Sequence, residues 1–210
     1  MSSSALAARL GVVAGVAGFW TFAAVGAAVE PGYDPSRDYL SALASVGAQR
    51  PALGLGMFVC GAGAVLAAAG VLRAVSPRAI LARRALVAAS GFVALAGVAR
   101  VTCLAGAGGC SAGPLDLDQV TLSSRTHGVS VAAYQVAFTV GLLALAVAAR
   151  ADRRRALASV AAVGAVLTPF LALDPLPLPE GLSQRLWVAA GHLVLVLLAT
   201  WPRGASSSPA

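Results

Sequence analysis

The sequence predicts an all-α membrane protein with six transmembrane helices, cytoplasmic N and C termini, and a short amphipathic outer helix between the first two spans. Hydrophobic residues make up 59% of the 210 positions and charged residues 11%, whereas soluble domains average about 25% charged. So few charges cannot cover a water-facing surface. The apolar runs are continuous and not alternating, which favours helices over a β-barrel, the other fold that satisfies its backbone in lipid.

Six apolar segments, each bounded by charged residues or proline, predict the spans. In chain order they are 10–29, 52–72, 85–99, 128–149, 156–173 and 186–201. The first is longer than the apolar core of a signal peptide, so we expect it to be retained as an anchor. The third is short, but arginines at its two ends reach the interface and extend it. We expect one transmembrane domain over 1–203 and a disordered tail over 204–210.

The arginines predict the orientation of the spans. All 15 basic residues are arginine; 10 fall on the side of the two termini and 5 on the other. The positive-inside rule therefore places both termini in the cytoplasm. The pI of about 10.6 then reflects membrane orientation, and we expect no nucleic-acid partner. The absence of lysine and asparagine indicates a GC-rich bacterial genome, so we expect the inner membrane of a bacterial cell.

The connection between the first two spans, residues 30–50, is unusually polar for this chain. Its sequence EPGYDPSRDYLSALASVGAQR holds three acids, two arginines and two tyrosines, with a turn signal at Pro31-Gly32. Asp38, Ser41 and Ser45 are spaced i, i+3, i+7 and would share one face of a helix. We expect a hinge followed by the amphipathic helix, which would roof the bundle on its outer side.

Other polar groups gather near the same outer side. Tyr134 follows His127 at i+7 in the fourth span, and His192 follows Arg185 at i+7 in the sixth, about 10 Å deeper. An ionisable group at that depth usually faces the bundle interior or a wet cavity. We therefore predict one outward-opening polar pocket. Its candidate residues are Asp38, Ser41, His127, Tyr134, Arg185 and His192.

Three interpretations of this pocket stay open. It binds a small or lipidic ligand; it is the site of a membrane-embedded hydrolase; or its groups only make contacts in a structural subunit. A hydrolase would use Zn²⁺ held by His127, His192 and Asp38, because catalytic zinc takes three protein ligands and keeps an open position. No P-loop, dinucleotide-binding glycine pattern or HExxH motif occurs, so we expect no other cofactor and assign no catalytic residue.

Two of the three cysteines fall in the predicted outer loop. Cys103 and Cys110 bound the glycine-rich sequence CLAGAGGC. A pair outside a bacterial membrane readily oxidises, so a disulfide is our first expectation, with two free thiols or a metal role as alternatives. Cys60 lies within a span and is expected to be a small packing residue.

The segment PGYDPSRDYLS, residues 31–41, resembles the pattern PGY-x-P-x-x-D-x-(I/L)-S of a bacterial membrane family, the domain of unknown function 998. The step His127-Gly128 after the cysteine loop, and the segment GLSQR at 181–185, fit the same family. The resemblance covers about residues 8 to 202. It implies a six-span integral membrane protein and no established reaction. The loop CLAGAGGC departs from the compact Cys-Pro-Gly-Cys-like form of some members.

Overall fold

The computed structural model describes residues 3–76, 78–101, 121–173 and 176–202. These residues form α1 (Ser3–Val29), the 3₁₀ helix η1 (Leu40–Ala44), α2 (Pro51–Val75), α3 (Ile80–Val98), α4 (Leu122–Ala151), α5 (Arg155–Ala172) and α6 (Glu180–Thr200). Within the described ranges, the six α-helices are each long and apolar enough to cross a membrane. The predicted all-α fold with six transmembrane helices is confirmed. The third span, predicted as short, begins five residues earlier than expected, at Ile80, so Arg83 and Arg84 lie in its first turns.

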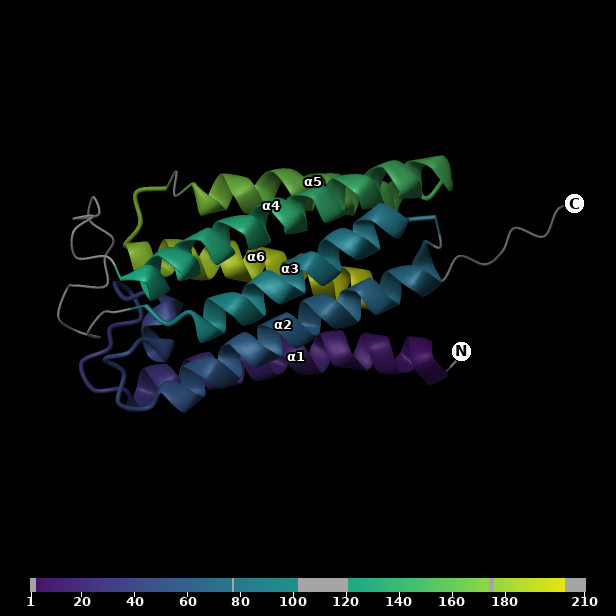
Figure 1. The fold of residues 1–210 in the computed structure, drawn as a ribbon. Helices are drawn as coiled ribbons and strands as arrows, with labels where there is room; N and C mark the ends of the chain where they lie inside the picture. The colour runs from purple at the N-terminus through teal and green to yellow at the C-terminus, as the bar shows by residue number, and fades with distance from the viewer. Residues whose placement is uncertain (1–2, 77, 102–120, 174–175, 203–210) are drawn as a thin grey trace, which may run out of the picture.

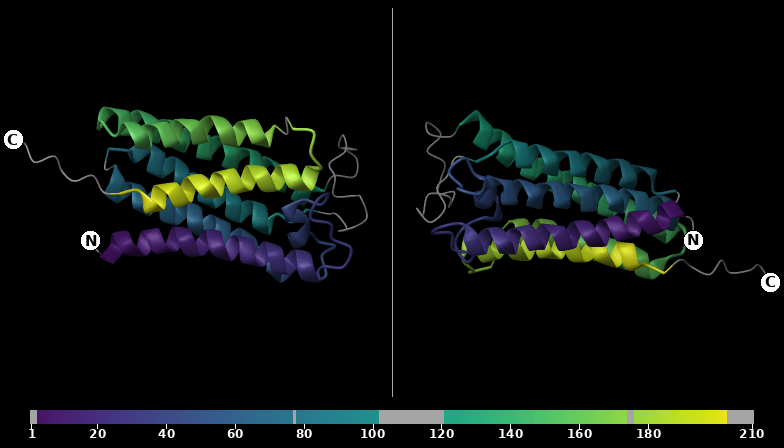
Figure 2. Two further views of the ribbon diagram at one scale, coloured as in Figure 1. Left: turned by 180° about the vertical axis from the view of Figure 1, so that it is seen from behind. Right: turned by 90° about the horizontal axis from the view of Figure 1, so that it is seen from below.

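The α-helices form a closed ring (Figures 1 and 2). Each packs beside its neighbour in the chain, and α6 returns to pack against α1. The start of α1 and the end of α6 meet, where Arg9 Nη2 donates a hydrogen bond to the Trp201 carbonyl at 2.7 Å. Residues 30–50, which we name the cap, lie at the opposite end (Figure 1). We refer to the two ends of the ring as the basic end and the cap end.

Apolar side chains fill the half of the ring nearest the basic end. Leu72 of α2, Leu145 of α4 and Leu198 of α6 are each at most 1% exposed. They belong to one continuous cluster that reaches Phe138, itself fully buried, near the middle of α4. The centre of the ring is therefore closed by packed side chains on this side.

The structure differs from the prediction in the cap. Residues 40–44 form one turn of 3₁₀ helix in place of an amphipathic helix, and all five are buried. Ser41 and Ser45 are therefore buried instead of lining a water-facing surface. The buried segment packs closely on α2: a Cβ added at Gly54 would lie 2.4 Å from the backbone nitrogen of Ala44. Because all five residues are buried, their side chains form no water-facing polar surface.

Candidate functional site

A buried glutamate closes the base of the cap. The carboxylate of Glu30, 7% exposed, accepts hydrogen bonds from the backbone N–H of Gln49 at 2.7 Å and of Arg50 at 3.1 Å. These bonds join the end of α1 to the residues that precede α2. The two ends of the 21-residue connection are therefore held together, and the connection forms a closed loop.

The other two acids of the cap fold its first turn. Asp34 accepts hydrogen bonds from the N–H and the hydroxyl of Ser36, at 2.8 and 2.6 Å, and these bonds hold the pKa of the Asp34 carboxyl below its usual value. Asp38 Oδ2 accepts from the N–H of Asp34 at 2.8 Å. Both carboxylates thus bind the cap's own backbone.

Helix α6 fastens the cap from below. Gln184 Oε1 accepts a hydrogen bond from the Leu40 N–H at 2.6 Å, and Arg185 Nη1 donates to the Asp38 carbonyl at 3.0 Å. Arg185 Nη2 also donates to the Tyr33 hydroxyl, with the guanidinium 5.7 Å from the centre of the tyrosine ring. Burial raises the pKa of Tyr33 and Arg185 opposes this in part, so the phenol stays neutral. The segments 31–41 and 181–185, singled out in the sequence, contact each other here.

A cavity lies beneath the cap, in the half of the ring nearest the cap end. Its volume is about 80 Å³, and its walls come from α1, α2, α3, α4 and α6. Leu40 and Ser41 of the cap contribute to its lining. Most lining side chains are apolar, including Phe19, Met57 and Val131. The polar lining residues are Ser41, His127, Tyr134, Gln184, Trp187 and His192.

The structure brings together four of the six predicted pocket residues: Ser41, His127, Tyr134 and His192 all line this cavity. The other two lie in or against the cap. The Asp38 carboxylate binds the N–H of Asp34, and Arg185 binds the Asp38 carbonyl. The cavity is therefore less charged than the sequence-based pocket, because its acid and its arginine act as supports of the cap.

The imidazole of His192 is the most unusual polar group of the cavity. The residue is 7% exposed, and its ring meets the rings of Phe19 and Trp20 edge-on, with centroids 4.6 and 5.9 Å away. In the described part of the chain, three buried side-chain polar atoms lack a hydrogen bond, and His192 Nδ1 is the one whose residue belongs to the cavity lining. A buried group of this kind ordinarily has a partner.

The second histidine is held by backbone carbonyls. His127 Nδ1 lies 2.7 Å from the Ala96 carbonyl oxygen and 3.1 Å from that of Ala99. Since carbonyls only accept, Nδ1 carries a proton and donates to them. Nearby, a Cβ added at Gly191 would lie 3.6 Å from the Tyr134 hydroxyl oxygen, an ordinary van der Waals contact, so the backbone of α6 passes close to this hydroxyl.

The zinc interpretation requires three ligands at one point. In the ranges that the structure describes, no three His, Cys, Asp or Glu side chains are grouped as a metal site requires. His127 and His192 line the same cavity, but the Asp38 carboxylate is bound to the cap backbone. Cys103 and Cys110 lie outside the described residues, so their disulfide stays a prediction.

Sequence reasoning missed a polar network that begins at Trp187 in the cavity lining and extends away from it. Trp187 Nε1 donates to Gln135 Oε1 at 2.7 Å, and Gln135 Nε2 donates to Thr168 Oγ1 at 3.2 Å, which ties α4, α5 and α6 together. The signal was present in the sequence: Gln135 is an amide in an otherwise apolar span, where it needs partners on neighbouring helices. Gln184, which bonds to Leu40 of the cap, was also not predicted as a site residue, although it lies in the segment 181–185 that the sequence singled out.

Comparison with known proteins gives a family match over most of the chain. The model of a family described as "Protein of unknown function (DUF998)" matches residues 13–201. No curated protein and no solved structure matches the chain significantly.

Proposed function

The chain belongs to the DUF998 family of proteins of unknown function, and we propose that it binds a small or lipidic ligand in the cavity beneath its cap. Its six apolar helices make it a multi-pass membrane protein. We place it in the inner membrane of a bacterial cell, with the cap on the outer side. The excess of arginine at the basic end supports this orientation.

The unpartnered nitrogen of His192 is the observation that carries the proposal. Leaving a buried donor or acceptor without a hydrogen bond costs about 1–3 kcal/mol. A ligand that bonds to Nδ1 recovers this free energy. His127, Tyr134 and Ser41 line the same cavity, so the imidazole and the two hydroxyl-bearing side chains offer further hydrogen-bonding groups at one place.

The cavity restricts the chemistry of the ligand. Its walls are apolar apart from a few polar groups, the usual composition of a small-molecule site. At about 80 Å³ it holds several water molecules, at about 10–15 Å³ each, and is smaller than a drug-sized pocket. We infer a slim apolar molecule, or the end of a lipid, that carries one hydroxyl or carbonyl group.

Binding is favoured over conduction by the packing below the cavity. Phe138, with Leu142 and Leu145 one and two turns further along α4, is fully buried in the apolar cluster of the basic-end half. These packed side chains therefore block the passage of a solute from the cavity toward the basic end. The arrangement suits a receptor or carrier that holds its ligand beneath the cap.

A matched pair of α4 variants tests the proposal. Val131 lines the cavity, whereas Val136 is 64% exposed on the outside of the ring. Each is replaced by phenylalanine, the protein is purified in mild detergent, and the molecules released by heat denaturation are identified by mass spectrometry. We expect Val136→Phe to release the same molecule as the wild type, and Val131→Phe to release about tenfold less, equivalent to about 1.4 kcal/mol. Equal release from both variants would contradict a ligand in this cavity.

A zinc-dependent hydrolase is the second candidate, favoured only by the presence of His127 and His192 in the lining of one cavity. Metal analysis of the same purified protein tests it directly. One zinc per chain, lost on replacing either histidine, would support it over a purely lipidic ligand.

A further inference from the structure

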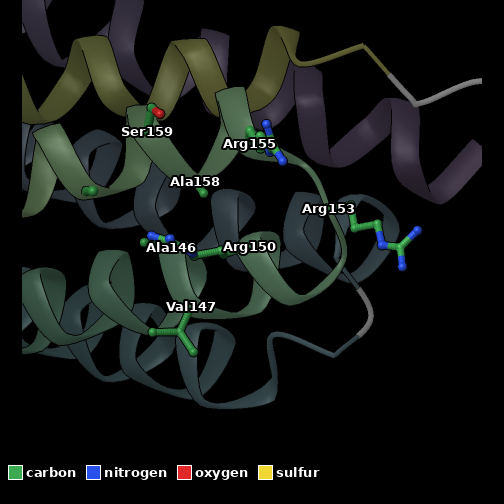
Figure 3. A pocket seen from close by; sticks show the side chains of 8 residues that line it. Ala146, Val147, Arg150, Arg153, Arg155, Ala158 and Ser159 are labelled. Atoms are coloured by element: carbon green, nitrogen blue, oxygen red, sulfur yellow. The ribbon is translucent and has the colours of Figure 1, made fainter.

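A groove at the basic end, on the opposite side of the bundle from the cap, is a second candidate site. It lies between the last turns of α4 and the first turns of α5, and its volume is about 760 Å³. Figure 3 shows Arg150 on α4 and Arg155 on α5 flanking it, with Arg153 projecting from the turn between the helices. We propose that this groove binds an anionic phospholipid of the adjacent leaflet, its phosphate on the arginines and an acyl chain along the groove.

The groove is positively charged, and the described part of the chain supplies no ion pair to its arginines. No acidic residue in the described ranges pairs with Arg150, Arg153 or Arg155. The nearest acid in sequence, Asp152, is engaged elsewhere: its carboxylate accepts from Arg78 Nη1 at 2.7 Å and from the Ser76 hydroxyl at 3.2 Å. The groove therefore carries the charge of three exposed arginines that no acid in the described ranges pairs with, which favours an anionic ligand.

The start of α5 adds to this positive potential. Arg154 is the N-cap residue of α5. Its side chain does not hydrogen-bond to the first free N–H groups of the helix. The positive end of the helix dipole lies at the same place. A phosphate beside Arg155, the first residue of the helix, would meet both the guanidinium and this helix end.

The backbone at Arg153 gives independent support. Arg153 has φ 57°, in the left-handed region that favours glycine. Its N–H bonds to the Arg150 carbonyl at 3.0 Å, and the Arg154 N–H bonds to that of Ala149 at 2.8 Å, the two bonds of a Schellman helix end. Glycine usually takes this position. An arginine there is unfavourable locally and points to a role for its side chain.

The residues below the arginines suit an acyl chain. On α5, Arg155, Ala158, Ser159 and Ala162 are spaced i, i+3, i+4, i+7 and so share one face. The small side chains leave the groove open for about 10 Å along the helix, from the charged rim toward the hydrocarbon. A soluble anion would use only the rim, whereas a phospholipid fills both parts. This continuity of a charged rim with an apolar trough selects a lipid over a free phosphate.

Native mass spectrometry of the full-length, detergent-purified protein tests the proposal, with phosphatidylglycerol and phosphatidylcholine at equal concentration. We expect the wild type to retain phosphatidylglycerol preferentially. Arg153→Gly suits the positive φ, so it keeps the fold, and should lower the preference about fivefold. Arg150→Gln/Arg155→Gln should lower it further. Arg37→Gln removes a charge at the cap end, where the side chain is 84% exposed, and should leave it unchanged.

Two further measurements distinguish binding of a lipid from binding of a soluble anion. Ala162→Trp keeps every charge but fills the trough, so it should weaken phosphatidylglycerol binding. Inorganic phosphate at the concentration of the lipid should displace none of it. The proposal is overturned if the arginine variants keep the wild-type preference, if Ala162→Trp has no effect, or if phosphate displaces the lipid. None of these outcomes bears on the cavity beneath the cap.

Discussion

Replacement of His192 by phenylalanine separates a ligand-binding imidazole from a structural one. In the structure the ring packs edge-on against Phe19 and Trp20, with Nδ1 buried and unpartnered. Phenylalanine keeps an aromatic ring at this place and removes the polar nitrogens. If the account is correct, the variant folds better than the ligand-free wild type and no longer binds the ligand.

The magnitude follows from these contacts. Removing an unsatisfied buried polar group raises the free energy of unfolding by about 1–3 kcal/mol. Each aromatic contact is worth about 0.5–1.5 kcal/mol and is retained. The larger ring has the neighbouring cavity of about 80 Å³ to expand into, so we expect little overpacking. The net gain is about 1–2 kcal/mol, which raises Tm by about 2–8 °C for a chain of this length.

The assay is thermal unfolding followed by far-UV circular dichroism, on protein washed extensively in detergent. Leu193→Phe, at a position 59% exposed on the same helix, is the control and should leave Tm unchanged. Molecules released from heat-denatured wild-type protein are then added back. They should raise Tm of the wild type and of the control, but not of His192→Phe. A drop of several degrees in Tm for His192→Phe, with no response of the wild type to the added molecules, would refute the reasoning.

Four further predictions concern the cap, the orientation and the metal alternative. Gly54→Ala should destabilise the protein by about 2 kcal/mol or more in the same unfolding assay, because its Cβ would lie 2.4 Å from Ala44 N. The control is Gly63→Ala, whose Cβ would have nothing within 4 Å; it should leave the stability unchanged or raise it by up to about 1 kcal/mol. Glu30→Gln should lower stability by about 1–2 kcal/mol, since it weakens two charge-assisted hydrogen bonds at the base of the cap, and unchanged stability would contradict the loop closure. After reduction, Cys110 should react with a membrane-impermeant maleimide added from outside the cell, and labelling only from the cytoplasmic side would reverse the orientation. Elemental analysis should find less than stoichiometric zinc, and one zinc per chain would favour the hydrolase.

The spans were predictable from sequence because burial in lipid leaves a strong compositional signal. Continuous apolar runs located all six helices. The depth of His192 below Arg185 also predicted correctly that the imidazole is buried among helices. The family resemblance, resting on residues 31–41 and 181–185, is confirmed by the match over 13–201.

The cap was less predictable, because its structure depends on contacts between distant segments. The spacing of Asp38, Ser41 and Ser45 fits an amphipathic helix, but in the structure residues 40–44 form a buried 3₁₀ helix packed closely on α2. Charge alone did not predict the backbone contacts of Asp38 and Arg185: both were predicted as pocket residues, and in the structure each binds a backbone group of the cap. A carboxylate or guanidinium near a polar loop has many backbone partners, and sequence spacing does not distinguish them.

An experimental density map of the purified protein in lipid nanodiscs tests the central claim most directly. The account predicts non-protein density beneath the cap, with an atom about 3 Å from His192 Nδ1, in hydrogen-bonding range. A collapsed cavity, or an imidazole bonded to a neighbouring helix, would contradict it.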